Sequence, residues 1–302
     1  MRHGLEMASL LGMSQVMLAA GLWATVGVAT QIVPEASALS AAVFGTFRMA
    51  LGGLAILGVA WLLSPDLPAA LRRLAPGALA AFALSSATFQ VCLFQSFALL
   101  GVTGTVVATV CLPPVLSTLA THLKGASTPS RGAVVALGLA VAGVLLFAWG
   151  DMAGDHPSAR ARGLAVAVLA AVAFVCMTAA ARSLGRTAGP LVVSGAGLTL
   201  SGLILAASLP LAGFQTGLST SDLTGELVAL VLYLGLGPTA LAYLLYCAGI
   251  AKCRSTDVGL VASMIEPAIA ALLAYLILRE TLTPQEIAGC LLIVLGMVWL
   301  AW

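Results

Sequence analysis

Two ionisable side chains, Arg48 and Glu266, stand alone in the middle of long apolar stretches of this sequence. A charged side chain at the centre of a bilayer costs at least about 2.5–3.5 kcal/mol, so one that is kept there marks a functional site by default. Small residues recur around Arg48 at helical spacing: Ala41, Gly45, Gly52 and Ala55. Such a stripe lets helices approach closely. We therefore expect Arg48 to hold helices together by pairing with a carboxylate or backbone carbonyls, with contact to an anionic substrate group as the alternative.

Prolines lie beside Glu266 and at a second, matching position of the chain. Pro267 supplies no N–H, which frees the backbone carbonyl of Ser263 and predicts a locally opened helix beside the carboxylate. Pro113 and Pro114 predict a similar break in another apolar stretch. Two breaks at matching places indicate a binding site at mid-depth. The alternative is that the prolines only kink helices for packing and that Glu266 is hydrogen-bonded internally.

Polar and aromatic residues near the middle of other apolar stretches are candidates for lining a cavity. They are Trp23, Phe89, Gln90, Phe94, Thr109, Phe174, Tyr243, Tyr246 and Ser263. Gln90 and Phe94 share a helix face at a spacing of four, and Tyr243 and Tyr246 share one at a spacing of three. Aromatic walls with a few hydrogen-bonding groups suit a medium-sized amphipathic solute. For any single aromatic residue, the alternative is packing against lipid or a neighbouring helix.

The elements that must position these residues are membrane-spanning helices. Of the 302 residues, 61% are hydrophobic and 8% are charged, and the mean hydropathy is +1.11. A soluble domain carries about 25% charged residues, and a membrane-spanning helix needs about 20 apolar ones. The uniformly apolar runs exclude a transmembrane barrel, whose strands alternate. Ten helices are predicted over residues 8–32, 39–63, 76–99, 103–123, 132–149, 162–184, 190–212, 225–249, 256–278 and 285–302.

The chain is a doubled unit. Residues 256–302 align with 103–149, so that Glu266 and Pro267 fall on Pro113 and Pro114, and residues 18–23 align with 169–174. We expect one repeat over 1–149, a loop over 150–161 and a second repeat over 162–302. Because each repeat holds five crossings, the second must be inverted. Inverted repeats are typical of secondary transporters, whose substrate site lies between the repeats.

Basic residues predict the orientation of the chain. With both termini in the cytoplasm, the cytoplasmic segments hold nine Lys and Arg residues and the outer loops hold three, which are Arg160, Arg162 and Arg279. This asymmetry favours cytoplasmic termini in a bacterial inner membrane. The first apolar run is too long for a cleaved signal peptide. The net charge of +2 then reflects positive-inside loops, and nucleic-acid binding is not expected.

Neither a cofactor nor a metal site is expected. The six cysteines are scattered without a Cys-x-x-Cys spacing, and the three histidines lie near ends or loops. An intramembrane enzyme would need a nucleophile with a base, or paired aspartates, within reach of each other. No predicted helix has a central aspartate, and His122 has no obvious partner. These observations argue against an enzyme.

The run from Ile265 to Gly289 resembles the C-terminal motif of the EamA family in the drug/metabolite transporter superfamily. Trp23 and the segment around Arg48 are similar to the first-half pattern of that family. The resemblance covers essentially the whole chain, although Pro113 stands in the first half where Glu266 stands in the second. The chain looks most like YddG-type bacterial exporters of aromatic and other amino acids.

This resemblance implies an all-helical membrane protein of ten helices in two inverted five-helix repeats. It also implies an inner-membrane exporter of amino acids or similar small metabolites that works by alternating access in the lipid bilayer. We expect a monomer, with flexing points at Gly237 and Pro238 and at residues 101–104. Two alternatives stay open: a proton-coupled exporter of cationic drugs, for which Glu266 would be the required carboxylate, and a carrier of nucleotide-sugars or sugar phosphates.

Overall fold

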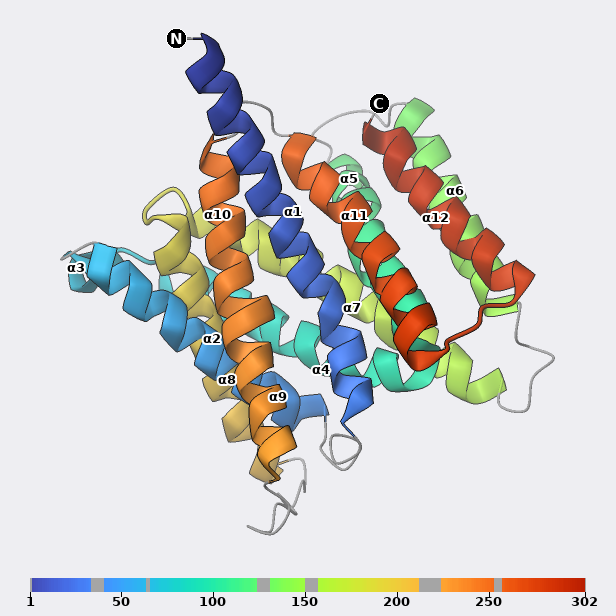
Figure 1. Ribbon diagram of the computed structural model, residues 1–302, viewed down its shortest axis with the longest axis horizontal. Coiled ribbons are helices and arrows are strands. Elements are labelled where there is room, and N and C mark those ends of the chain that lie inside the picture. The colour runs from blue at the N-terminus through green and yellow to red at the C-terminus, as the bar shows by residue number, and fades with distance from the viewer. Residues whose placement is uncertain are drawn as a thin grey trace.

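The structure of the protein, a computed structural model, describes residues 2–33, 41–63, 66–123, 131–149, 157–211, 224–252 and 257–301. These residues form helices and short connections, with no strand among them (Figure 1). The helices are α1 (Arg2–Ile32), α2 (Ala41–Leu63), α3 (Leu67–Arg72), α4 (Pro76–Val106), α5 (Leu112–Leu123), α6 (Arg131–Trp149), α7 (Pro157–Leu184), α8 (Pro190–Leu211), α9 (Gly225–Gly235), α10 (Ala242–Lys252), α11 (Asp257–Leu273) and α12 (Pro284–Ala301). Short π-helical segments follow three of them: η2 (Val107–Cys111), η4 (Leu236–Leu241) and η5 (Ala274–Leu278).

Among the described residues, six helical stretches are long and apolar enough to cross a membrane. They are Leu10–Ile32, Ala41–Leu63, Pro76–Ala120, Ser158–Leu184, Pro190–Leu209 and Gly225–Lys252. Three shorter apolar stretches accompany them: Val134–Leu146, Ile265–Leu278 and Pro284–Trp299. Large apolar side chains such as Leu62, Leu203 and Leu291 are exposed on their outer faces. Helices satisfy their own backbone hydrogen bonds, so this exposed apolar surface is compatible with lipid.

The helix boundaries follow the predicted ones with four main differences. Helix α1 begins at Arg2 and not at residue 8. Helix α7 begins at Pro157, so residues 157–161 belong to a helix and not to the predicted loop. Proline is favoured in the first turn of a helix, where its missing N–H is not needed. The short helix α3, whose first turn also contains a proline, was not predicted. The long stretch that begins with α4 runs through the predicted gap at 100–102 with only a kink.

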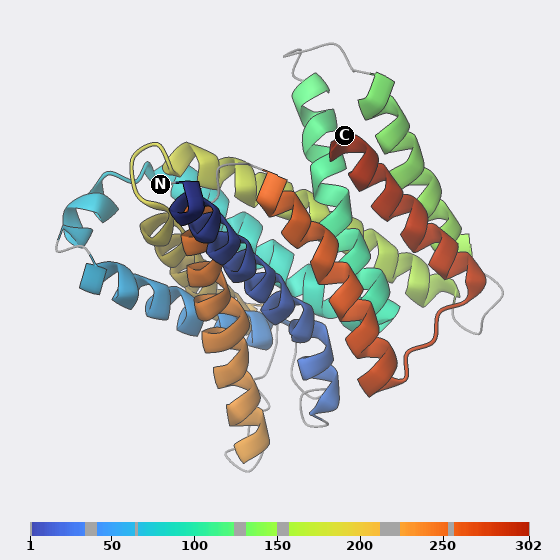
Figure 2. The ribbon, with the colours of Figure 1, turned by 45° about the horizontal axis from the view of Figure 1, so that its top comes forward.

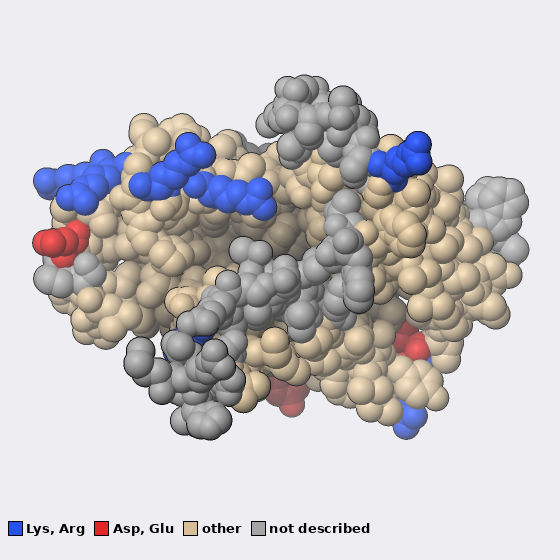
Figure 3. Space-filling view, turned by 90° about the horizontal axis from the view of Figure 1, so that it is seen from above, with Lys and Arg blue, Asp and Glu red and all other residues tan. Residues whose placement is uncertain are grey.

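The helices pair in a pattern that repeats when the halves of the chain are exchanged. Helix α1 packs on α10 and α11, whereas α7 packs on α4 and α5. Helix α2 packs on α8, and α6 packs on α12. Figure 2 shows α6 and α12 side by side, with α5 next to them and away from α2 and α3. The start of α1 and the end of α12 lie on the same side of the molecule (Figure 1). Seen from that side, most of the visible Lys and Arg side chains gather along one edge of the molecule (Figure 3).

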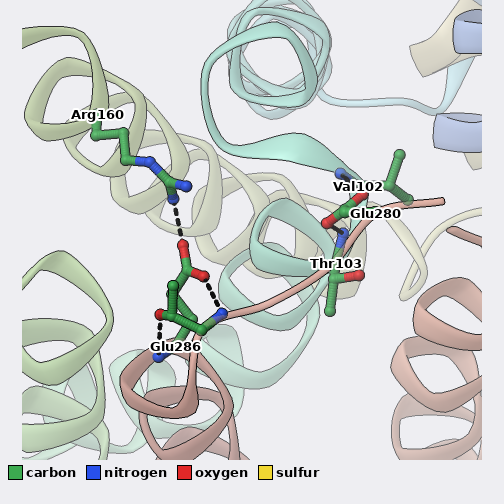
Figure 4. A network of polar contacts seen from close by, with 6 residues as sticks. Val102, Thr103, Arg160, Glu280 and Glu286 are labelled. Atoms are coloured by element: carbon green, nitrogen blue, oxygen red, sulfur yellow. Dashed lines mark hydrogen bonds and ion pairs between the residues drawn. The ribbon is translucent and has the colours of Figure 1, made fainter. Parts of the chain in front are cut away.

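The kink in α4 is built by Gly101. Its φ of 76° and ψ of −179° are not helical, and a new helical stretch starts at the next residue. Both oxygens of the Glu280 carboxylate cap this new start: Oε2 accepts from the backbone N–H of Val102 at 3.0 Å and Oε1 from that of Thr103 at 3.1 Å (Figure 4). Arg279 precedes this carboxylate in the left-handed conformation, with φ 58°.

We expect Gly101→Ala to lower the melting temperature of the detergent-solubilised protein. A left-handed conformation costs an L-residue about 1–2 kcal/mol, and a Cβ at residue 101 would meet the Glu280 Oε1 atom at 2.9 Å. Gly77→Ala is the matched control, because it lies in the same helix with open space around it. The measurement is thermal unfolding: samples are heated to a series of temperatures, and size-exclusion chromatography gives the fraction that stays folded at each one. Equal melting temperatures for the two variants would contradict the expected strain.

Candidate functional site

Arg48 lies at a buried contact between α2, α4 and η4. Its Nε–H donates to the Thr239 hydroxyl at 2.9 Å, and its Nη1 donates to the Gln90 side-chain carbonyl at 3.1 Å. Arg48 is 6% exposed, Gln90 4% and Thr239 0%. Arg48 therefore joins three helical elements, but its hydrogen-bond partners are an amide and a hydroxyl and not the carboxylate or backbone carbonyls expected.

Two glycines on α2 allow the helical elements that carry these partners to pack close to Arg48. Gly45 lies almost one turn before it, and a Cβ there would be 3.0 Å from the Gln90 Cβ. Gly52 lies one turn after it, and a Cβ there would be 2.3 Å from the Thr239 Cγ2. No larger side chain fits at either crossing without displacing a neighbour. The stripe of small residues on α2 therefore allows the close approach that its spacing predicts.

The π-helical segment η4 orients Thr239. Pro238 has no N–H with which to bond the carbonyl of Leu234, four residues earlier. The Thr239 hydroxyl donates to this carbonyl at 2.7 Å. The same hydroxyl oxygen accepts from Arg48. Because Pro238 leaves the Leu234 carbonyl without a backbone donor, this carbonyl can accept from the Thr239 hydroxyl and orient it. The oriented hydroxyl in turn positions the Arg48 guanidinium.

Glu266 lies on α11 and faces the interior of the bundle. One turn later, the Cδ1 atom of Ile269 lies 4.0 Å from the position that a Cβ on Gly21 of α1 would take. Ala270, on the same face, is fully buried. The Glu266 carboxylate and the Arg48 guanidinium interact electrostatically. Helical spacing therefore places Glu266 on the face of α11 that packs on α1.

The predicted opening of the helix at Pro267 is wrong. Helix α11 is α-helical from Asp257 to Leu273 with Pro267 inside it, and the π-helical segment η5 begins only at Ala274. Membrane helices tolerate an internal proline, because neighbouring groups can satisfy the freed carbonyl. Before Pro113 and Pro114, by contrast, the π-helical segment η2 replaces regular α-helix, although the chain stays helical.

Aromatic residues form two contacts at equivalent places of the repeat. Trp23 on α1 contacts Tyr243 and Tyr246 on α10, with ring centroids 5.7 Å and 5.3 Å apart. Phe174 on α7, which aligns with Trp23, contacts Phe89 on α4 at 5.5 Å. All five rings are half-buried. Tyr243 and Tyr246 share a face, as their spacing predicts.

The remaining predicted lining residues differ in their surroundings. Phe94, one turn after Gln90, is buried against Phe44 and Phe97 at 5.5 Å and 6.2 Å, and forms part of the core. The Thr109 hydroxyl donates to the Thr105 carbonyl of its own helix at 2.8 Å. The side chain of Ser263 lies outside the described residues. Gly237 and Pro238 lie in the π-helical segment η4, beside Thr239.

The sequence did not predict three polar contacts. Thr239 was missed although a hydroxyl directly after a proline in an apolar run is a detectable signal. The Glu280 cap and the ion pair between Arg160 on α7 and Glu286 on α12 join residues that no spacing relates (Figure 4). Glu280, Glu286 and Arg160 also line a pocket of about 520 Å³ beside the kink at Gly101.

The second half of the chain carries a family match. Residues 161–302 match the EamA-like transporter family. The chain is 28% identical over 287 residues to the uncharacterized transporter YwfM of Bacillus subtilis (strain 168). The aligned region covers 94% of this chain and 91% of the relative. The EamA-like chain is therefore a multi-pass membrane transporter and not an enzyme.

The fold of this EamA-like transporter is similar to that of a protein of known crystal structure. The TM-score is 0.64, the sequence identity is 21%, and the likeness covers 97% of this chain and 96% of the other. At this level of identity the likeness concerns the fold alone.

Proposed function

We propose that this EamA-like transporter exports amino acids, or similar small amphipathic metabolites, across the bacterial inner membrane by alternating access. The observation that carries the proposal is the buried contact of Arg48 with Thr239, which joins a helix of the first half to a segment of the second. Alternating access needs a site between two halves that move relative to each other. The half-buried aromatic contacts that Trp23 makes with Tyr243 and that Phe89 makes with Phe174 suit the apolar part of a solute.

The proposed architecture is ten crossings in two inverted repeats, 1–149 and 162–302, joined by residues 150–161. The helix pairing that repeats on exchange of the halves supports it. The start of α1 and the end of α12 lie on one side, and most of the Lys and Arg side chains visible from that side gather along one edge of the molecule. By the positive-inside rule, this side is the cytoplasmic one. A monomer with both repeats in one chain suffices for one pathway.

The proposed flexing points are the places where regular α-helix is interrupted. Gly237 and Pro238 lie in η4, and residues 101–104 begin at the kink of Gly101. Pro113 and Pro114 follow η2 directly. Movement at such positions disturbs few backbone hydrogen bonds, because some of them are already displaced.

Uptake of labelled threonine, methionine and phenylalanine into liposomes that contain the purified protein tests the proposal. We expect saturable uptake of at least one of them above the level of empty liposomes. Absence of saturable uptake across a full amino-acid panel would refute amino-acid transport. The resemblance to YddG-type exporters predicts that aromatic amino acids are among the substrates.

The same assay with and without a pH gradient tests the second candidate, a proton-coupled exporter of cationic drugs. Glu266 favours this candidate, because a mid-membrane carboxylate can bind a proton or a cation. Drug-dependent flux that needs the gradient and is lost in Glu266→Gln would support it. Amino-acid flux that is indifferent to the gradient would exclude it. A carrier of nucleotide-sugars or sugar phosphates would need a basic cavity, and Arg48 alone gives little support to it.

A further inference from the structure

The Glu280 carboxylate joins the two halves of the chain. Its oxygens accept from the backbone N–H groups of Val102 at 3.0 Å and of Thr103 at 3.1 Å (Figure 4). Glu280 lies in the segment between η5 and α12, in the second half, whereas both donors follow the kink of α4, in the first. A carboxylate can accept with both oxygens at once. One side chain therefore makes a two-point clamp between the halves.

The backbone on each side holds its part of the clamp. On the first-half side, Gly101 interrupts α4, so that the next two residues have the unpaired N–H groups of a helix start. On the second-half side, Glu280 lies three residues before Thr283, whose N–H donates to the Glu286 Oε2 at 2.7 Å at the start of α12. The carboxylate is thus attached closely to α12. Movement of one half against the other would act on the clamp itself.

The clamp lies on the face of the molecule away from the two chain ends. The pocket of about 520 Å³ beside it is lined from the first half by Gln31 and Val102, and from the second by Glu280 and Glu286. The end of α1 and the start of α12, which carry two of these residues, lie opposite the start of α1 and the end of α12 (Figure 1). In the proposed orientation this is the outer face. Since its walls come from both halves, separation at the clamp would widen a space that already exists.

We propose that Glu280 is the outer gate residue of the transporter. Its clamp on Val102 and Thr103 keeps the outer face closed, and release of the clamp opens the pocket between the halves to the outside. Alternating access moves one repeat against the other around the solute site. The kink at Gly101 favours movement at this place, because regular helix is already interrupted there. The inference rests on the proposed alternating access and does not depend on which solute is carried.

A contact toward the opposite face provides a comparison. The Lys252 Nζ, at the end of α10, donates to the Gln15 Oε1 on α1 at 2.8 Å. The next residue, Val16, packs on α10, because a Cβ on Gly249 would lie 2.7 Å from its Cγ2. Val16 is 1% exposed, and Val102 at the outer clamp is 0% exposed. Each valine can therefore report whether its own face is closed.

Cysteine labelling with a membrane-impermeant maleimide tests the inference. Val102→Cys is labelled from outside in spheroplasts, Val16→Cys is labelled in inside-out vesicles, and the unsubstituted protein gives the background of the native cysteines. We expect Glu280→Gln to raise the labelling rate of Val102→Cys at least about tenfold, because a carboxamide accepts with one oxygen only. We expect no rise for Val16→Cys. Glu226→Gln is the matched control, since Glu226 is exposed at the start of α9, and is expected to change neither rate.

The two reporters separate a gate from a purely structural cap. An unchanged rate for Val102→Cys would overturn the inference, and so would a rise at both valines, which would indicate general loosening of the fold. If Glu280→Gln does not elute as a single symmetric peak, Glu280→Asp replaces it. Its carboxylate is shorter by one methylene, and a smaller rise at Val102→Cys alone is expected. Absence of amino-acid uptake in liposomes would overturn the proposed substrate but not the gate.

Discussion

Replacing Gly52 by leucine is expected to abolish the folded protein. A Cβ at this position would lie 2.3 Å from the Thr239 Cγ2 and 3.0 Å from the backbone carbonyl oxygen of Gly235. Overpacking a close contact costs about 1–3 kcal/mol and more when backbone must move. Displacement of Thr239 would also remove the hydrogen bond that it accepts from Arg48. The measurement is the fraction of detergent-solubilised protein that elutes as a single symmetric peak.

The control is Gly58→Leu on the same helix, where a Cβ would have no heavy atom within 4 Å of it. This variant changes the helix propensity and apolar surface of α2 in the same way but meets open space. We expect it to elute as the wild type does. A Gly52→Leu protein with wild-type yield and melting temperature would show that the contact between α2 and η4 is not as close as described.

Replacing Glu286 by alanine is expected to destabilise the protein by about 2–3 kcal/mol, since hydrogen bonds to charged groups contribute about 1.5–3 kcal/mol. Glu286 is 1% exposed and makes an ion pair with Arg160. Its Oε2 also accepts from the backbone N–H of Thr283 at 2.7 Å, while the Thr283 hydroxyl accepts from the Glu286 N–H at 3.3 Å. This reciprocal arrangement is a capping box, which stabilises the start of α12.

The matched control is Glu226→Ala. Glu226 also lies in the first turn of a helix, α9, but is exposed. Its loss is expected to change stability by less than about 0.5 kcal/mol. Thermal unfolding of both variants in detergent gives the comparison. A smaller loss of melting temperature in Glu286→Ala than in Glu226→Ala would contradict the capping and ion-pair roles.

The sequence predicted the helices well because hydropathy alone identifies them in a membrane chain. Every predicted crossing coincides with a described apolar helix or with part of the long stretch Pro76–Ala120. The boundary at α7 was missed because hydropathy falls at Arg160 and Arg162, although Pro157 offered a helix-start signal. Charged residues can stay helical at the end of a span, where they reach the membrane surface.

The candidate site could be predicted only in part. Arg48 and Glu266 were found because isolated charges in apolar runs are conspicuous. The partner Thr239 lies 191 residues from Arg48, and only tertiary packing relates the two. The same limit explains the error at Pro267. A proline shows which carbonyl is freed but not whether neighbouring groups compensate, so the sequence could not show that α11 continues through it.

The Glu280 cap has a consequence for the order in which the protein is made. The N–H groups of Val102 and Thr103, at the start of a new helical stretch in the first half, take their acceptor from a residue 178 and 177 positions later. While the ribosome has released only the first half, this acceptor does not yet exist. Helix starts without an acceptor are destabilised. The early part of the chain therefore reaches its final form only after nearly all of the protein has been synthesised and inserted.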